Sequence, residues 1–167
     1  MSEGRLIPWS ETHSWRCTAC GRCCVGYRVP LKMEEYVKVA SRYGYDSFDI
    51  GLGKVYLRHG FDSRCVFQHP SQGRWVCELQ GIKPLACKLF PFRVLPKPIY
   101  PRGDGSEYRY RDRVFHVYLD PDCEGIVLGR PSERFLRQTI PEVVEIGLGI
   151  RVKQRLTTSK YISWTPP

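Results

Sequence analysis

Eight cysteines, and the spacing of the first four, are the feature of this chain most able to do chemistry. Those four fall in the segment Cys17-Thr-Ala-Cys20-Gly-Arg-Cys23-Cys24. Two cysteines separated by two residues can turn both sulfurs toward one ion, because the backbone between them folds into a knuckle whose N–H groups point at the thiolates. Gly21 favours such a turn, since glycine readily adopts a positive φ. The segment is typical of a thiolate metal centre.

The spacing also bears on which metal is bound. A C-x2-C-x2-C run binds three irons of a cubane cluster in bacterial-type ferredoxins. The later Cys-Pro of that pattern is missing here, so a fourth ligand must come from Cys24 or from a distant cysteine. Adjacent side chains generally point in different directions. We therefore expect Cys23 and Cys24 to serve two sites, or one of them to serve a cluster while the other lies in the core.

All eight cysteines are candidate metal ligands, and they are numerous enough for two four-thiolate sites. Both zinc and [4Fe–4S] clusters accept four thiolates, and the spacing leans toward [4Fe–4S]. The candidates are Cys17, Cys20, Cys23, Cys24, Cys65, Cys77, Cys87 and Cys123.

The cellular compartment expected for the chain bears on whether its cysteines bind metal or form disulfides. No apolar run approaches the roughly 20 residues that span a bilayer, and Pro8 stands where a secretory apolar segment would begin. We expect a cytoplasmic protein, in which thiols stay reduced and dense cysteines more often bind metal. The chain has no asparagine and only 2 methionines, which is typical of a thermophilic source. Because intracellular proteins of hyperthermophiles can carry disulfides, pairing of the cysteines remains the alternative.

The elements that must position the first cysteines follow from periodicity and turn residues. A helix is expected over 31–43, ending at Gly44, and a strand over 54–58. A β-hairpin over 65–79, turning at 69–73, would bring Cys65 near Cys77. The apolar stripe expected to face the core comprises Met33, Tyr36, Val37, Ala40 and Tyr43.

The second half of the chain predicts fewer regular elements. Pro84 fits the first turn of a short helix that could return Cys87 to the knuckle. An extended loop is expected over 91–105, a strand over 108–119, and a helix capped by Ser132. The chain thus predicts a small, irregular, metal-stabilised α+β fold. Its parts are a cysteine-cluster domain over 1–130 and a C-terminal helix with a basic tail over 131–167.

The net charge of +9 suggests a polyanionic partner such as RNA or the ribosome. Residues 151–167 contain four basic residues, the last of them Lys160, and no acid. Over 108–113 the basic residues alternate with tyrosines, so three arginines would share one strand face. A merely solvated surface is the alternative to phosphate contacts. The candidate nucleic-acid contacts are Arg109, Arg111, Arg113, Arg151, Lys153 and Arg155.

The cysteine pattern also carries a family resemblance. The run Cys17 to Cys24, then Cys65, Cys77, Leu85-Ala-Cys87-Lys-Leu-Phe90-Pro91 and Cys123-Glu-Gly125, resembles the CxxCxxCC (YkgJ-like) cysteine cluster family of zinc- or iron-chelating proteins. The resemblance covers about 17–125 and gives all eight cysteines a counterpart. It implies metal chelation. The family usually has Arg-Pro where this chain has Lys83-Pro84, a change that keeps the charge but loses the guanidinium fork.

Two functions follow from these observations. The first is a metal-binding module without independent catalysis, which docks on RNA or a ribonucleoprotein. The second is an iron–sulfur-dependent redox enzyme or protein- or tRNA-modifying enzyme. Flagellin lysine methylases carry a similar cysteine cluster that looks like an iron–sulfur site, but nothing here resembles a methyltransferase cofactor loop, so we do not transfer that activity. The chain also has no P-loop, dinucleotide-binding glycine motif or H-E-x-x-H.

Overall fold

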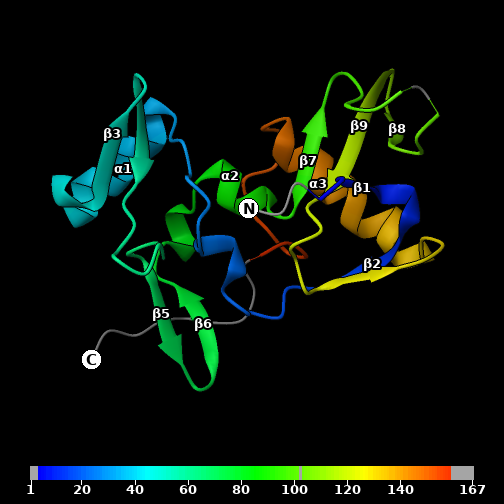
Figure 1. The fold of residues 1–167 in the computed structure, drawn as a ribbon. Helices are drawn as coiled ribbons and strands as arrows, with labels where there is room; N and C mark the ends of the chain where they lie inside the picture. The colour runs from blue at the N-terminus through cyan, green and yellow to red at the C-terminus, as the bar shows by residue number, and fades with distance from the viewer. Residues whose placement is uncertain (1–3, 102, 159–167) are drawn as a thin grey trace. The chain divides into compact units, whose positions relative to one another are not determined.

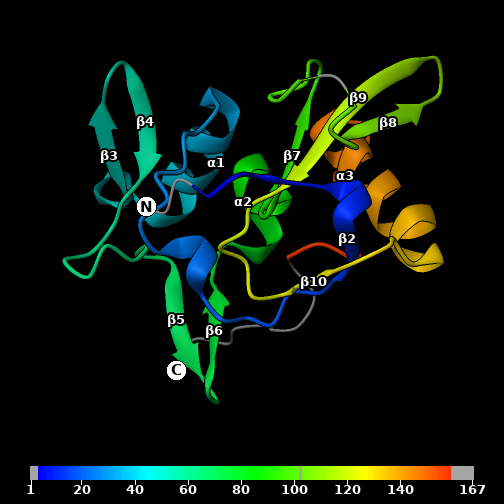
Figure 2. The same cartoon turned by 45° about the vertical axis from the view of Figure 1, so that its right-hand side comes forward.

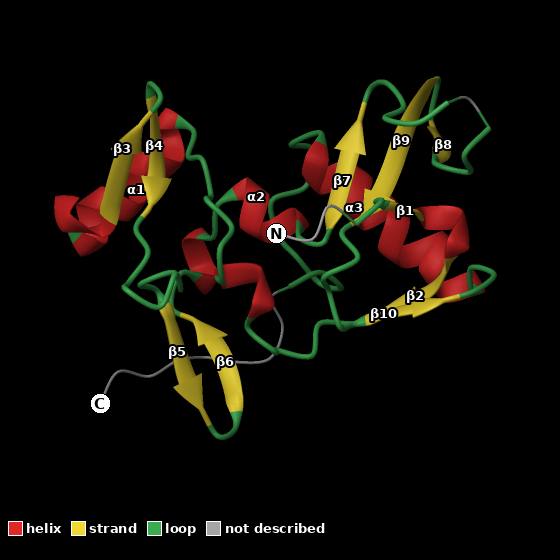
Figure 3. Cartoon of the chain, viewed as in Figure 1, coloured by secondary structure: helices red, strands yellow, loops and turns green. Residues whose placement is uncertain are grey.

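The computed structural model describes residues 4–101 and 103–158. It contains short helices and small antiparallel sheets, so the predicted α+β class is confirmed (Figures 1 and 3). The described residues form two compact units. We call 4–18 with 88–158 the sheet unit, and 19–87 the knuckle unit. The predicted division between residues 130 and 131 does not coincide with a division between these units, because the C-terminal helix packs on a strand of the sheet unit.

The sheet unit is built on a four-stranded antiparallel sheet with one long central strand. β9 pairs with β7 on one side; on the other, its end at Tyr118 and Leu119 pairs with β1 and its beginning pairs with β8. Both views place β7, β9 and β8 side by side, with α3 behind them (Figures 1 and 2). The strands are β1 (Ile7–Pro8), β7 (Phe92–Leu95), β8 (Glu107–Tyr110) and β9 (Arg113–Leu119).

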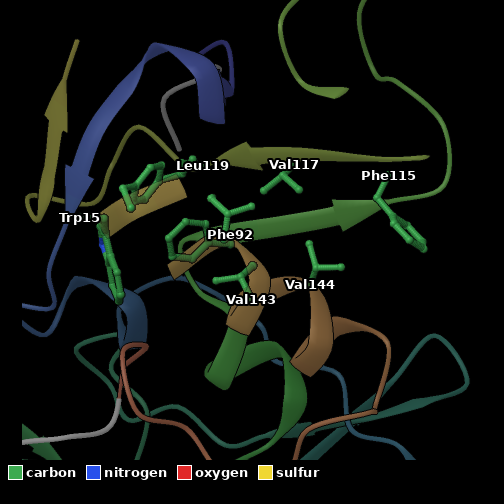
Figure 4. Packing of buried hydrophobic residues seen from close by; sticks show 9 residues of the cluster. Trp15, Phe92, Phe115, Val117, Leu119, Val143 and Val144 are labelled. Atoms are coloured by element: carbon green, nitrogen blue, oxygen red, sulfur yellow. The ribbon is translucent and has the colours of Figure 1, made fainter. Parts of the chain in front are cut away.

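The C-terminal helix closes one face of this sheet. It begins as predicted at Ser132, whose Oγ accepts a hydrogen bond from the Phe135 amide at 3.2 Å. It continues through the π-helical η5 (Phe135–Thr139) into α3 (Ile140–Gly147). Pro141 has no amide hydrogen to donate, which is consistent with the widened turn just before it. Figure 4 shows Val143 and Val144 of α3 against the sheet residues of the core.

Two expectations for this unit are wrong. The expected loop over 91–105 contains β7. The expected single strand over 108–119 is a hairpin that turns at Arg111, where φ is +52°. In that hairpin Arg109 pairs with Val114 and Tyr110 pairs with Arg113, so Arg109 and Arg113 lie on opposite faces. The predicted row of three arginines on one strand face does not form.

The remaining strands of the sheet unit join its two chain segments. β2 (Thr12–Trp15) follows the short helical turn η1 (Trp9–Glu11) and pairs antiparallel with β10 (Ile126–Leu128). A hydrogen bond from the Arg16 amide to the Gly125 carbonyl at 3.1 Å extends this ladder. Sequence periodicity did not predict either strand, because a strand of three or four residues is too short to show a period-two pattern.

The knuckle unit packs one helix and two hairpins around a smaller core. The buried residues of this core cluster are Val29, Val39, Leu57, Cys65, Phe67 and Leu79. Its elements are η2 (Arg22–Cys24), α1 (Met33–Tyr43), η3 (Tyr45–Ser47), β3 (Phe48–Gly51), β4 (Lys54–Leu57), β5 (Gln68–Ser71), β6 (Arg74–Cys77) and η4 (Gln80–Ile82), followed by α2 (Leu85–Leu89), within which the unit ends at Cys87.

The predicted helix over 31–43 is confirmed, but its buried stripe is displaced. α1 ends at Gly44, where φ is +82°, as expected for a glycine stop. Met33 and Val37 are 71% and 55% exposed, whereas Val39 is fully buried. Tyr43 packs edge-on against Phe67 at a centroid separation of 5.0 Å. The stripe prediction is therefore wrong for Met33 and Val37, since residue 39 takes the central buried position.

The two hairpins agree only partly with the sequence prediction. The expected strand over 54–58 is β4, paired with β3, which was not predicted. The second hairpin forms with Gln68 opposite Cys77, but its turn is only Gln72 and Gly73, both with positive φ. That geometry is the two-residue turn that matches the twist of paired strands. Cys65 lies just before β5 rather than within it.

Candidate metal centre

The first cysteines of the knuckle unit lie on a tight backbone turn. Ala19 and Gly21 both have positive φ, at 57° and 82°, and η2 follows at once. The Cys24 amide donates to the Gly21 carbonyl at 3.1 Å, which closes the turn. The Trp75 amide donates to the Ala19 carbonyl at 2.9 Å, so β6 holds the turn from outside. This is the knuckle that the cysteine spacing predicted.

The indole of Trp75 covers this turn. A Cβ on Gly21 would lie 2.6 Å from Cγ of Trp75, so only glycine allows the ring to approach this closely. The guanidinium carbon of Arg64 lies 3.6 Å from the Trp75 ring centroid, in a cation–π contact. Sequence reasoning did not select Trp75 or Arg64. The sole signal was an aromatic residue two positions before Cys77.

Three further parts of the knuckle unit bring their cysteines to the same core. The Cys65 amide donates to the Cys24 carbonyl at 2.8 Å. Cys77 ends the strand whose partner residue, Gln68, donates its amide to the Cys65 carbonyl at 3.0 Å. Cys24, Cys77 and Cys87 all pack against the core cluster that contains Cys65. The hairpin and α2 thus gather Cys65, Cys77 and Cys87 as the sequence predicted.

The adjacent cysteines do not behave as expected. The sulfurs of Cys23 and Cys24 lie 3.7 Å apart, within hydrogen-bond reach, so their side chains do not diverge. Both residues lie in the 3₁₀ turn Arg22–Cys24. Two thiolates on one tetrahedral zinc with bonds of about 2.3 Å would stand about 3.8 Å apart. The pair therefore has the spacing of two ligands of one ion.

Hydrogen bonding, burial and nearby charge give these thiols different pKa values. The hydrogen bond from Cys24 lowers the pKa of Cys23 to about 7, against the opposing effect of burial and with the help of the Lys83 charge. The same hydrogen bond, and then burial, raise the pKa of Cys24. Burial raises the pKa of Cys65 to about 11 and the pKa of Cys87 well above its ordinary value. Buried thiols of this kind ionise only when a cation compensates the charge.

Lys83 is a cation already inside this group. It is 8% exposed, and its charge favours the thiolate forms of Cys23, Cys77 and Cys87. Its Nζ donates to Oε1 of Gln80 at 3.4 Å. The amide that starts α2, on Leu85, donates to Oε1 of Glu35 at 2.7 Å, which fixes the helix that carries Cys87. Lys83 was noted in the sequence only through its place before a proline; its burial was not foreseen.

In the metal-free protein, iodoacetamide should alkylate Cys23 with a midpoint near pH 7, whereas Cys65 should react only near pH 11. The thiolate is the nucleophile, so a lowered pKa brings reactivity to lower pH and a raised pKa delays it. Peptide mass spectrometry across a pH series measures both midpoints. In Cys24→Ala the hydrogen bond to Cys23 is lost and the Cys23 midpoint should rise. Identical midpoints for Cys23 and Cys65 would contradict this account.

Cys17 and Cys123 belong to the sheet unit, apart from the six cysteines of residues 19–87. Both are partly buried and pack against the core of their unit. Nε1 of Trp15 donates a hydrogen bond to Sγ of Cys123 at 3.2 Å. No disulfide joins any of the eight cysteines, all of which lie in the described part of the chain. The disulfide alternative therefore finds no counterpart in this structure.

The donor set fits a metal in type and in place. Thiols that are buried or half-buried, packed on one core and beside a lysine, suit a thiolate-bound metal that carries excess negative charge. Within residues 4–101 and 103–158, no three histidine, cysteine, aspartate or glutamate side chains already stand in an arrangement that could hold an ion. The fit is thus one of donor chemistry and of packing on one core, not of completed coordination geometry.

The predicted nucleic-acid contacts are dispersed. Arg109, Arg111 and Arg113 are exposed, but they are split between two faces and a turn, as described above. Arg151 is committed to internal ion pairs, at 3.1 Å to Glu142 and 2.7 Å to Glu145. The side chains of Lys153 and Arg155 are exposed, and Lys160 lies outside the described residues.

Glu142 organises the segment that the sequence treated as a basic tail. Its carboxylate is buried, and it accepts hydrogen bonds from the backbone amides of Arg155 and Leu156 at 2.8 and 2.7 Å. Together with the Arg151 ion pair, these bonds tie residues 151–157 to α3. Arg151 as a phosphate contact stays a prediction, and its charge is already paired with Glu142 and Glu145 within the protein.

A small α+β fold that gathers buried and half-buried thiols beside a lysine defines a cysteine-rich metal-binding protein. Residues 16–123 match the model of the CxxCxxCC family, described as "Putative zinc- or iron-chelating domain". Because this match covers more than half of the chain, the protein belongs to the CxxCxxCC family. The resemblance drawn from the cysteines is confirmed. No curated protein and no solved structure matches the chain. In the described residues, no helix is long and apolar enough to cross a membrane.

Proposed function

We propose that the knuckle unit chelates a metal centre as its function, and that this centre is a [4Fe–4S] cluster. The observation that carries the proposal is the packing of four cysteines on one small core, with Lys83 among the thiols. The C-x2-C-x2-C spacing of the sequence supports iron–sulfur over zinc. The ligands would be drawn from Cys20, Cys23, Cys24, Cys65, Cys77 and Cys87.

The protein's own residues have definite tasks in this proposal. A bound [4Fe–4S] cluster would supply one-electron transfer. Lys83 offsets part of the negative charge of the thiolates, which favours binding. Trp75 shields the knuckle from water on the side where it contacts Gly21. Because the ligands must lose protons, metal uptake releases protons and weakens as the pH falls.

Zinc is the second candidate, and one observation favours it. The 3.7 Å separation of the Cys23 and Cys24 sulfurs suits two ligands of a single tetrahedral ion. Irons at separate corners of a cubane would hold their thiolates further apart. A zinc site would be structural and would stabilise the small core of residues 19–87.

Anaerobic purification followed by elemental analysis and a visible spectrum tests the proposal. A [4Fe–4S] centre predicts iron and inorganic sulfide in equal amounts, a brown colour, and an EPR signal after reduction. Stoichiometric zinc in a colourless protein would contradict the cluster and favour zinc, the second candidate. Protein without any bound metal, obtained anaerobically from cells grown with iron and zinc, would contradict metal chelation by this chain.

Docking on RNA or the ribosome stays a prediction, supported only by the net charge of +9 and the exposed arginines. Binding of the full chain to single-stranded RNA should weaken steeply with salt, and Arg113→Gln should reduce the slope of log K against log salt by about 0.7. Arg137→Gln makes the same charge change at a residue paired with Glu133 and should leave the slope unchanged. A flat salt titration of the unaltered protein would contradict the prediction.

The enzyme alternative also stays a prediction. It requires a cluster with an open or exchangeable iron position and a protein or tRNA substrate. A redox-silent centre, or zinc, would contradict it.

A further inference from the structure

The indole of Trp15 makes an unusual hydrogen bond. Its Nε1 donates to Sγ of Cys123 at 3.2 Å, and the side chain is 7% exposed. A buried indole N–H needs an acceptor, and it usually finds oxygen. A neutral thiol is a weak acceptor, whereas a thiolate accepts a charge-assisted bond that is roughly twice as strong. The choice of sulfur as acceptor therefore suits a cysteine that is ionised by a metal.

The surrounding structure fixes the direction of this bond. The Trp15 ring packs edge-on against Phe92 with centroids 5.1 Å apart (Figure 4). Trp15 pairs with Ile126 across the β2–β10 ladder. On the other side, the Cys123 amide donates to the Asp120 carbonyl at 3.2 Å, and the Ile126 amide donates to the Cys123 carbonyl at 3.3 Å. Donor and acceptor are thus both held by backbone bonds and core packing.

A second thiol, that of Cys17, lies at the same end of the β2–β10 ladder. Cys17 directly follows Arg16, whose amide bonds the Gly125 carbonyl, two residues after Cys123. Both cysteines therefore lie at one end of the β2–β10 ladder and both pack against the core of the sheet unit. Gly125 permits the close approach of the two segments, because a Cβ there would lie 2.0 Å from the Arg16 carbonyl oxygen.

We infer that Trp15 is a positioning residue that donates its indole N–H to the metal-bound thiolate of Cys123. The inference goes beyond the proposed function, whose ligands lie within residues 19–87, because it takes Cys123 of the sheet unit as a further metal ligand, as the cysteine pattern predicted. Hydrogen bonds to a ligating sulfur orient the ligand and tune the metal. Removing a residue in such a supporting position typically lowers metal affinity about 10- to 100-fold.

Two measurements on the full chain test this inference. In the unaltered protein, the ¹H–¹⁵N resonance of the Trp15 indole should shift when metal-free protein takes up Zn²⁺, because the acceptor gains negative charge. Trp9 provides the matched control within the same unit: its Nε1 donates to the Glu107 carbonyl at 3.1 Å, and its resonance should not move. This comparison needs no substitution, so it does not depend on the folding of a variant.

The second measurement uses Trp15→Phe, which keeps an aromatic ring but removes the donor. Competition with a chelator should show Zn²⁺ affinity lowered about 10- to 100-fold, and Co²⁺ should give a shifted thiolate charge-transfer band. Trp9→Phe should change neither. If the unaltered protein takes up Zn²⁺ while the Trp15 resonance and the Trp15→Phe affinity stay unchanged, the inference fails and the proposed function stands. If it takes up neither Zn²⁺, Co²⁺ nor iron, both fail.

Discussion

Gly125→Ala should separate β2 from β10 and cost the protein about 3 kcal/mol or more of its free energy of unfolding, above the usual range for overpacking. The added Cβ would lie 2.0 Å from the Arg16 carbonyl oxygen and 3.3 Å from Nε1 of Trp15. The nearest atoms are backbone, so no side-chain rotation relieves the clash. The β2–β10 ladder, which ends beside Cys17 and Cys123, must open.

Urea denaturation measures the loss, and metal content measures its consequence. Gly81→Ala is the control, since nothing lies within 4 Å of the Cβ it would add and its φ is not positive. That control should stay within about 0.5 kcal/mol of the unaltered protein. A Gly125→Ala protein as stable as the control would show that the β2–β10 ladder does not form as described.

Removing the metal with a chelator should unfold the knuckle unit and leave the central sheet protected. The core cluster of residues 19–87 contains six buried residues, one of which is Cys65, and Val76 of β6 is a seventh buried apolar residue there. Structural zinc contributes an apparent binding free energy of about 10–16 kcal/mol in small metal-stabilised domains, and a core of this size cannot replace such a contribution. Val117 and Leu119, fully buried in β9, rest on a separate apolar cluster.

Amide hydrogen exchange distinguishes the two regions. After chelation, the amides of α1 and of β5 and β6 should exchange much faster, while those of β9 should keep their protection. Adding back the metal under anaerobic, reducing conditions should restore the protection. Equal protection of residues 19–87 with and without metal would contradict a stabilising role for the centre.

The parts predicted from sequence are those governed by local chemistry. Cysteine spacing fixed the expectation of a knuckle, and Gly21 and Gly44 have the positive φ that such turns and stops require. Ser132 caps its helix as its side-chain chemistry suggests. The cysteine pattern also sufficed to identify the family. In each case a few neighbouring residues determine the structure.

The parts missed depend on residues that are distant in sequence. Pairing of β2 with β10 joins residues over a hundred positions apart, and neither strand is long enough to show a period. The turn at Arg111 lacks the Asn or Gly that usually marks a positive φ, so the hairpin looked like one strand. Val39 rather than Val37 is buried, because Val39 belongs to a core cluster whose other members lie elsewhere in the sequence. The roles of Lys83 and Trp15 likewise required knowledge of their neighbours in space.

X-ray absorption at the metal edge of the anaerobically purified protein tests the central claim most directly, because it reports the atoms bound to the metal. Coordination by the cysteines predicts a shell of about four sulfur atoms at about 2.3 Å, for zinc and for iron–sulfur alike, with a further iron–iron shell for the cluster alone. A shell made only of oxygen and nitrogen atoms would show that the metal is not held by these thiols, and would contradict the account.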